Sequence, residues 1–177
     1  FYTGKGDQGQ SYIGDKKIDK TCLDIEALGV LDELNSFLGL VTNQKIIPDN
    51  KEALRAVQED LFIVQAAIAA LMIGGHTPPV FSKEKVAHLE SLIDKLEKQV
   101  QPKRGFIVSG STEGSSWLDY ARTIARKAEV SILKIQKEKE VNPHILSYMN
   151  RLSSLIYAMA RAEAKENDID ESHPTYK

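Results

Sequence analysis

Helix-breaking residues are confined to a few short stretches of this 177-residue chain, and this confinement strongly limits the folds available to it. Nine of the eleven glycines fall into three clusters, at residues 4–14, 74–75 and 105–114. The segments between the clusters are long and carry apolar residues at the three- and four-residue spacing of one helix face. Glycine inside a helix costs about 1 kcal/mol relative to alanine. The distribution therefore predicts long helices joined by glycine-rich loops.

Five segments are expected to be helical. A proline precedes the second of these segments, and Ser82 can cap the third. Asn142 followed by Pro143 is a strong signal for the start of the fifth segment. The expected helices are residues 23–44, 49–73, a stretch that begins after Ser82, 115–140 and 143–167. No strand is apparent, so we predict one all-α domain over residues 1–177, a five-helix bundle. A glycine-rich ligand loop (1–21) precedes the bundle (22–167), and an acidic, frayed tail (168–177) follows it.

Composition narrows the classes of function. Lys and Arg number 23 against 25 Asp and Glu, a balance that disfavours general nucleic-acid binding. The single cysteine, Cys22, excludes an internal disulfide or a multi-cysteine zinc site. No glutamate stands three residues before a histidine, so the di-iron motif is absent, and we predict no protein metal site. The most apolar run, residues 61–73, is too short to cross a bilayer, and no signal peptide is visible. We therefore expect a cytoplasmic protein without membrane contact.

The first glycine cluster reads G-x-G-x-x-G from Gly4 to Gly9. A dinucleotide-binding fingerprint needs a strand before it and a helix after it, and neither is expected here, so we reject that interpretation. What remains is a flexible backbone with side chains that can donate hydrogen bonds to a polyphosphate. These are Thr3, Lys5, Gln10, Ser11 and Lys20. A loop that merely connects elements stays an open alternative.

Two polar stripes and two helical glycines are further candidates. The first stripe, within about 60° of helical arc, is Arg122, Arg126 and Glu129. The second lies on the last helix and is Asn150, Ser154, Tyr157 and Arg161. Either stripe could be a solvent-facing surface with no ligand. Gly29 and Gly39 flank Asp32 and suggest close approach of another helix or a ligand, with tight helix packing as the alternative for Gly39.

Five segments in order carry a resemblance to a known family. They are YTGKGDQG at 2–9, EALG and LDELN within 26–35, FIVSGS at 106–111, AR and RKAE within 121–129, and VNP with NRLS within 141–153. Together they resemble the PduO-type ATP:cob(I)alamin adenosyltransferases over nearly the whole chain. The resemblance implies a five-helix bundle that assembles as a homotrimer with active sites between subunits.

The same resemblance implies an activity. The enzyme would transfer the 5′-deoxyadenosyl group of ATP to the cobalt of cob(I)alamin, giving adenosylcobalamin and triphosphate, in cobalamin salvage or biosynthesis. ATP and cobalamin would be substrates and Mg²⁺ would accompany ATP. A flavoprotein reductase and an adenosylcobalamin-dependent enzyme would be candidate protein partners.

Site residues follow by similarity, position by position. The ATP-binding set is Thr3, Gly4, Lys5, Gly6, Gln10, Ser11, Lys20, Arg126, Lys127, Ala128, Glu129, Val130 and Asn150. Asp32 and Arg122 match the family's ion pair near the corrin, and Phe106 matches its aromatic residue that excludes the lower axial ligand. With Arg126, these three are the predicted catalytic residues.

The sequence also departs from the family pattern. Ser109-Gly110-Ser111 stands where Pro-Gly-Gly is frequent, so the segment after Phe106 is expected to be less stiff. Gly4 stands where the family often has a basic residue, Thr21-Cys22 follow Lys20 in place of two aspartates, and Lys127 replaces a second arginine. From the residues alone, two other classes stay open. One is a helical binding or scaffold protein whose glycine-rich ends fold on a partner. The other is a nucleotide hydrolase, although no residue set that could activate water is found.

Overall fold

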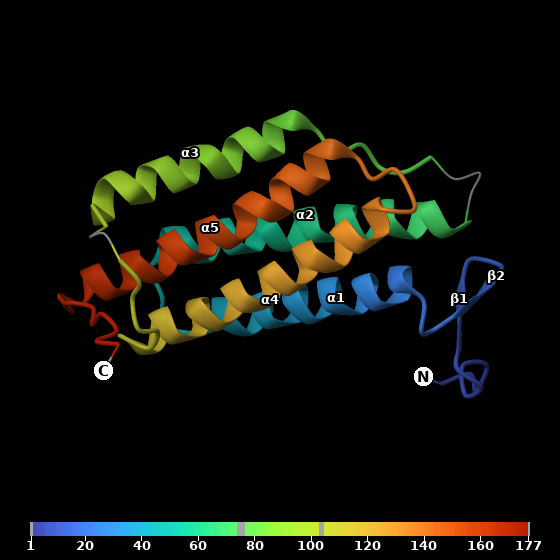
Figure 1. Ribbon diagram of the computed structural model, residues 1–177, viewed down its shortest axis with the longest axis horizontal. Coiled ribbons are helices and arrows are strands. Elements are labelled where there is room, and N and C mark those ends of the chain that lie inside the picture. The colour runs from blue at the N-terminus through green and yellow to red at the C-terminus, as the bar shows by residue number, and fades with distance from the viewer. Residues whose placement is uncertain (1, 74–76, 103–104, 177) are drawn as a thin grey trace.

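The computed structural model describes residues 2–73, 77–102 and 105–176, and within these ranges the chain is mostly helical. The elements in order are β1 (Gln10–Ile13), β2 (Lys16–Asp19), α1 (Leu23–Thr42), α2 (Pro48–Ile73), α3 (Lys83–Val100), α4 (Glu113–Gln136) and α5 (Pro143–Glu166). Figure 1 shows the five helices packed into an elongated bundle, with the hairpin at one end of the long axis and the C-terminal tail at the other. The predicted five-helix bundle is confirmed.

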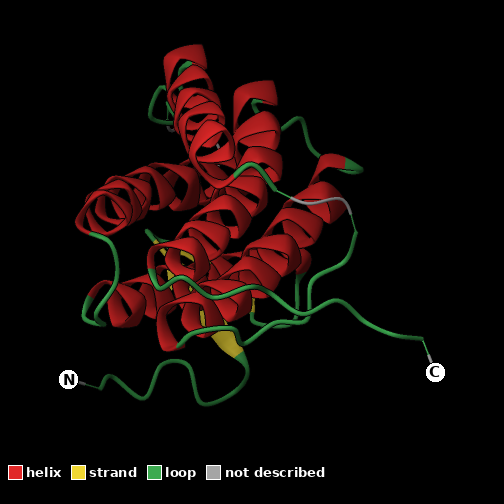
Figure 2. Cartoon of the chain, turned by 90° about the vertical axis from the view of Figure 1, so that its left-hand side faces the viewer, coloured by secondary structure: helices red, strands yellow, loops and turns green. Residues whose placement is uncertain are grey.

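The core is built from the apolar stripes that define the helices. Leu31, Leu34 and Leu38 of α1 are fully buried, as are Met149 and Leu152 of α5. Helix α4 packs along both α1 and α5, while α2 covers α1 and α3 covers α5; the end-on view of Figure 2 shows the helices gathered around this centre. Burying one such aliphatic side chain contributes about 1.5–3 kcal/mol, so these stripes fix which helices meet.

Local signals set the helix ends, and some bounds differ from the prediction. Helix α4 begins at Glu113, before the expected residue 115, because Thr112 and Ser115 form a reciprocal capping box. The Asn142 side chain accepts from the His144 N–H at 2.8 Å, so the predicted start of α5 is confirmed. Ser82 occupies the N-cap of α3 but its side chain makes no capping bond. Helix α2 ends at Ile73, and the predicted stop at residues 74–75 lies outside the described residues.

The N-terminal segment is not a plain loop, which corrects the expectation of no strands. Strands β1 and β2 pair antiparallel, with Gln10 opposite Asp19 and Ile13 opposite Lys16. Gly14 takes a positive φ of 57° in the two-residue turn, a conformation that two-residue hairpins favour and that glycine adopts without strain. Each strand has four residues, too few for an alternating pattern to stand out from the sequence.

Helix α2 is the longest of the five described helices and contains a long apolar stretch. At 26 residues, with a window of mean hydropathy 1.6, it is long and apolar enough to cross a membrane by length and composition, unlike the shorter run noted above. A core helix of a bundle meets the same criteria. Its buried face also carries Asn50 and Asp60, which pair with Glu163 and Tyr148 of α5. These two side-chain pairs join α2 to α5 within the bundle.

Candidate functional site

The hairpin and the residues before it line an open polar cavity of about 580 Å³. Six of the seven predicted nucleotide-binding residues in this part of the chain line it: Thr3, Lys5, Gly6, Gln10, Ser11 and Lys20. The seventh, Gly4, takes a φ of 68° in the turn before them but does not line the cavity. These six residues bring two ammonium groups, two hydroxyls and an amide to the cavity, and such donors suit a polyphosphate. Tyr12, Gly14 and Asp15 complete the lining, so one carboxylate also faces the cavity.

Gly6 and Lys20 fix the shape of this cavity. The Lys20 Nζ donates to the Gly6 carbonyl at 2.9 Å, and the Lys20 N–H donates to the Gly9 carbonyl at 2.9 Å. A Cβ atom on Gly6 would lie 2.9 Å from Lys20 Nζ and 3.1 Å from the Gln10 carbonyl oxygen. A larger residue at position 6 would displace the end of the Lys20 side chain and press on the Gln10 carbonyl, so glycine allows the loop to approach the strand closely. This role resembles that of glycines in phosphate-binding loops, where the backbone approaches closely.

A second polar surface lies where α4 and α5 run together. The Asn150 Nδ2 donates to Glu129 Oε1 at 2.8 Å, so two predicted ATP-binding residues from different helices are joined. Arg126 is exposed, and with Arg122 and Tyr157 it lines a cavity of about 320 Å³ between α3, α4 and α5. The Arg122 guanidinium stands 6.0 Å from the Tyr157 ring centroid. The predicted stripes on α4 and α5 thus share one surface.

Other residues of the predicted α4 segment point elsewhere. Lys127 forms an ion pair with Glu33 of α1 at 2.6 Å, on a different side of α4 from Arg126. Ala128 is fully buried, so its methyl group belongs to the core and offers no surface to a nucleotide. Val130 is 53% exposed. Within one chain, the segment 126–130 therefore does not present a single ligand-facing surface, because successive helical residues point in different directions.

The structure does not bring Asp32 and Arg122 together within one chain. Asp32 is exposed and lines an open hollow of about 640 Å³ between β1, α1 and α2, next to Ser11 and Gly29. Arg122 faces the other cavity, where its nearest carboxylate is Asp119, with Nε and Oδ1 4.0 Å apart. A Cβ on Gly29 would meet nothing within 4 Å, whereas one on Gly39 would lie 3.2 Å from Gln58 Nε2. Tight packing therefore explains Gly39, but nothing described in this chain explains Gly29.

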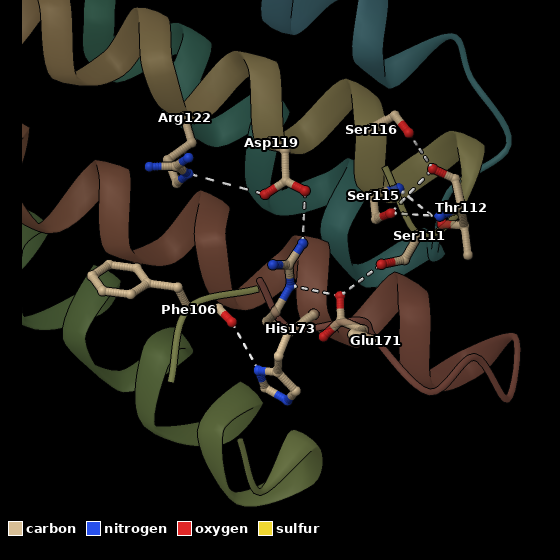
Figure 3. Close-up of polar contacts among 10 residues, drawn as sticks. Phe106, Ser111, Thr112, Ser115, Ser116, Asp119, Arg122, Glu171 and His173 are labelled. Carbon is tan, nitrogen blue, oxygen red and sulfur yellow. Dashed lines mark hydrogen bonds and ion pairs between the residues drawn. The ribbon is translucent and has the colours of Figure 1, made fainter. Parts of the chain in front are cut away.

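A buried ionic network links this surface to the C-terminal tail, and sequence reasoning missed it. Arg161, expected on a polar stripe, is 2% exposed and donates from Nη2 to Asp119 Oδ2 at 2.7 Å. Its Nε lies 3.1 Å from Glu171 Oε1. Figure 3 shows Asp119 between Arg122 and this network. Asp119 and Arg161 are 42 residues apart in sequence, and no local pattern pairs them.

The tail was expected to be frayed, but it packs against the segment that carries Phe106. The Val108 N–H donates to the Ser172 carbonyl at 2.9 Å, and His173 Nδ1 lies 2.8 Å from the Phe106 carbonyl oxygen. The Phe106 ring itself is 77% exposed. In Figure 3 the ring points away from His173 while the carbonyl points toward it. The structure therefore exposes a large aromatic ring on a backbone that is hydrogen-bonded to the C-terminal tail.

Burial shapes the electrostatics of two carboxyl groups near these elements. Burial raises the pKa of Glu171, although the Arg161 charge and the Ser111 hydroxyl oppose the shift. Burial likewise raises the pKa of Glu163, against hydrogen bonds from the Ile47 N–H and the Asn50 amide. Among the described residues, no cluster of three or more His, Cys, Asp or Glu side chains could hold a metal ion. The donors around the N-terminal cavity suit the oxygens of a phosphate chain rather than a bare cation.

Comparisons with known proteins place these features in a family. The family model described as cobalamin adenosyltransferase matches residues 1–163. A corrinoid adenosyltransferase PduO from Salmonella typhimurium is 36% identical over 168 residues, which cover 92% of this chain and 49% of that protein. A corrinoid adenosyltransferase from Bacillus subtilis is 34% identical over 165 residues, covering 91% of this chain and 84% of that one. The chain spans about half the length of the first of these relatives.

Solved structures agree with the sequence comparisons. A variant PduO-type ATP:corrinoid adenosyltransferase from Lactobacillus reuteri, solved with cobalamin and ATP, superposes with a TM-score of 0.92 at 29% identity and 98% coverage of both chains. A second variant of that enzyme, complexed with ATP, gives a TM-score of 0.88 at 29% identity and the same coverage. The sequence segments, the five-helix fold with its hairpin and these matches agree, and the chain belongs to the cobalamin adenosyltransferase family.

Proposed function

We propose that this protein transfers the 5′-deoxyadenosyl group of ATP to the cobalt of cob(I)alamin and releases triphosphate. The observation that carries the proposal is the family match over residues 1–163. The N-terminal cavity, lined by Lys5, Lys20 and the glycine-rich loop, supports it. A similar structure from Lactobacillus reuteri was solved with both cobalamin and ATP. The reaction is an alkyl transfer: a bond forms between cobalt and C5′, and the bond from C5′ to the triphosphate oxygen breaks. The leaving triphosphate takes the electron pair.

The protein's part in this step is alignment and charge stabilisation. Cob(I)alamin is itself a strong nucleophile, so no general base or protein nucleophile is needed. Lys5 and Lys20 lie on the N-terminal cavity and would neutralise charge that develops on the triphosphate, with Arg126 joining from α4. Mg²⁺ would arrive with ATP and be held by phosphate and water oxygens. The hydrogen-bonded pair of Glu129 and Asn150 would orient the nucleotide.

The harder chemical task is to make cob(I)alamin from cob(II)alamin. Reduction becomes easier when axial ligands are removed from cobalt, and a wedge that blocks the lower face would favour the four-coordinate state. Phe106 supplies such an apolar group, since its ring is mostly exposed in this chain. The electron would come from a reductase, for which a flavoprotein is a natural candidate. An adenosylcobalamin-dependent enzyme would receive the product, and the cytoplasm is the compartment in which we place these steps.

The site would be completed between subunits of a homotrimer. Within one chain the β1–β2 hairpin, which lines the N-terminal cavity, and the segment before α4, which carries Phe106, lie toward opposite ends of the bundle (Figure 1). Asp32 and Arg122, the matched ion pair, face different cavities of the same chain. An ion pair between Asp32 of one subunit and Arg122 of another would bring the ATP loop and the corrin surface together. The open space beside Gly29 leaves room for that approach.

One assay tests the function directly. The protein is mixed with ATP, Mg²⁺ and chemically reduced cobalamin, and the adenosylcobalamin spectrum is followed with triphosphate release. If product appears at the same rate without protein, or at the same rate with boiled protein, the proposal is rejected. A helical scaffold or binding protein predicts no product and no ATP-dependent change in the N-terminal loop. A hydrolase predicts loss of ATP without adenosylcobalamin.

The wedge role is tested with Phe106→Ala. The variant should slow turnover from cob(II)alamin far more than turnover from pre-reduced cob(I)alamin, because only the first route needs the axial ligand removed. Equal losses in both assays would remove Phe106 from this role while leaving the transferase activity itself established.

A further inference from the structure

The segment from Gly105 to Thr112 that carries Phe106 has little structure of its own. Gly105 and Gly110 take positive φ values of 122° and 102°, which only glycine adopts without strain. The residues between them form no helix or strand. The Phe106 ring does not anchor the backbone either, since it is mostly exposed. Some other part of the molecule must therefore determine where this ring stands.

The C-terminal tail, residues 168–176, provides that support. Among the described residues, the hydrogen bonds on the backbone of Phe106 and Val108 both come from this tail. The Phe106 carbonyl can only accept, so His173 donates to it through Nδ1 at 2.8 Å. The Ser172 carbonyl accepts from the Val108 N–H at 2.9 Å. Together the two bonds fix the backbone on both sides of residue 107.

Glu171 anchors the tail to both the segment and the bundle. Its Oε1 accepts from the Ser111 hydroxyl at 3.2 Å and lies 3.1 Å from Arg161 Nε (Figure 3). Arg161 is buried on α5 and is itself held by Asp119 of α4. The contact with Arg161 is an ion pair to a guanidinium that is buried and held in place, so Glu171 ties the tail to the bundle at a fixed point. Ser111 is also one of the residues at which this chain departs from Pro-Gly-Gly, so the less stiff segment gains a contact from outside.

We propose that Glu171 and His173 are positioning residues for Phe106, holding its backbone so that the ring stands where it blocks the lower face of cobalt. This inference rests on the proposed function, in which Phe106 is the wedge. Neither residue needs to touch the corrin, because each acts through the backbone of the segment. A displacement of about 1 Å can cost on the order of a hundredfold in rate when geometry matters, so loss of one tether is enough to be measured.

The test compares His173→Ala, His173→Asn and Glu171→Ala in the full-length protein. The Asn amide nitrogen replaces the Nδ1 donor, whereas Ala has no donor. Both alanine variants should reduce turnover from cob(II)alamin by about tenfold and change turnover from pre-reduced cob(I)alamin by less than about twofold. His173→Asn should recover most of the loss. Thr175→Ala, an exposed tail residue without a described contact, is the matched control and should behave as wild type.

A spectroscopic readout separates positioning from general damage. With ATP bound, the fraction of four-coordinate cob(II)alamin, measured by electron paramagnetic resonance, should fall in His173→Ala and return in His173→Asn. In a Phe106→Ala background, His173→Ala should add little further loss, because its effect passes through the ring that is already gone. Thermal unfolding of each variant shows that the bundle remains folded.

The outcomes distinguish the wedge role of Phe106 from the positioning role of the tail. If Phe106→Ala is not selective for the cob(II)alamin route, the wedge role in the proposed function fails. If Phe106→Ala is selective but the tail variants match wild type, or lose both routes equally, the positioning inference is overturned and the proposed function stands. A loss from His173→Ala that is as large without the Phe106 ring as with it would also overturn the inference.

Discussion

Replacing Arg161 with methionine tests whether the buried network holds the bundle together. Arg161 and Asp119 are 2% and 5% exposed at their side chains, and their closest atoms are 2.7 Å apart. Removing one partner of such a pair costs about 3–5 kcal/mol, because the other charge remains buried without compensation. Here Arg122 stands 4.0 Å from the second Asp119 oxygen and relieves part of that cost. We therefore expect a loss near the lower limit, about 3 kcal/mol.

The assay is thermal and denaturant unfolding of Arg161→Met beside two controls. For a chain of this size, about 3 kcal/mol corresponds to a fall in Tm of roughly 6–12 °C. Arg151→Met changes the same residue type on the same helix, but its pair with Glu90 is half exposed, so it should cost at most about 1 kcal/mol. The double variant Asp119→Leu/Arg161→Met should recover part of the stability, since the two most deeply buried charges are removed together and only the less buried Glu171 and Arg122 lose a partner. A loss for Arg161→Met no larger than that for Arg151→Met would refute the reasoning.

Three further predictions concern the site and the core. Arg126→Ala should reduce kcat/KM for ATP by about 2–4 kcal/mol, roughly 30- to 1000-fold, because bound triphosphate would turn this exposed group into a buried charge partner; unchanged ATP kinetics would reject its assignment. Gly6→Ala should raise the KM for ATP without lowering the Tm of the bundle, since the added Cβ collides with Lys20 Nζ and the Gln10 carbonyl at the hairpin; a KM equal to that of wild type would contradict the close approach. Burial raises the pKa of Glu163, so the fold favours its neutral form, and the stability present at low pH is lost as the pH rises through the folded pKa. Glu163→Gln should therefore have a higher Tm than wild type at pH 8. The difference in Tm should shrink as the pH falls toward 4.5, the ordinary pKa of a glutamate, and a difference that does not change with pH would refute this.

Much of the helical architecture was predictable because its signals are local. The stripes of α1 and α5, the Asn142-Pro143 start and the scarcity of glycine within the helices are all local signals, which lie within a few residues of the structure they determine. The hairpin was missed because four-residue strands carry too little pattern. The start of α4 was misplaced because the capping pair Thr112 and Ser115 stands just before the apolar stripe.

The sequence also identified a basic, glycine-rich cavity lining, since Thr3, Lys5 and Lys20 fall within one short segment. It could not show that Asp32 and Arg122 face different cavities, because that depends on the direction in which whole helices pack. That the side chain of Ala128, one of the predicted ATP-binding residues, lies in the core likewise depends on how α4 packs.

By itself, then, the sequence determined the helices, the family and the chemistry of the N-terminal loop, because periodicity, capping and loop composition are properties of neighbouring residues. Only the tertiary structure decided that Arg161 is buried against Asp119 and that the tail holds the Phe106 segment. Phe106 and His173 are 67 residues apart, and Asp119 and Arg161 are 42 apart. Contacts across such separations depend on how the helices pack and where the chain ends emerge, and no local pattern encodes them.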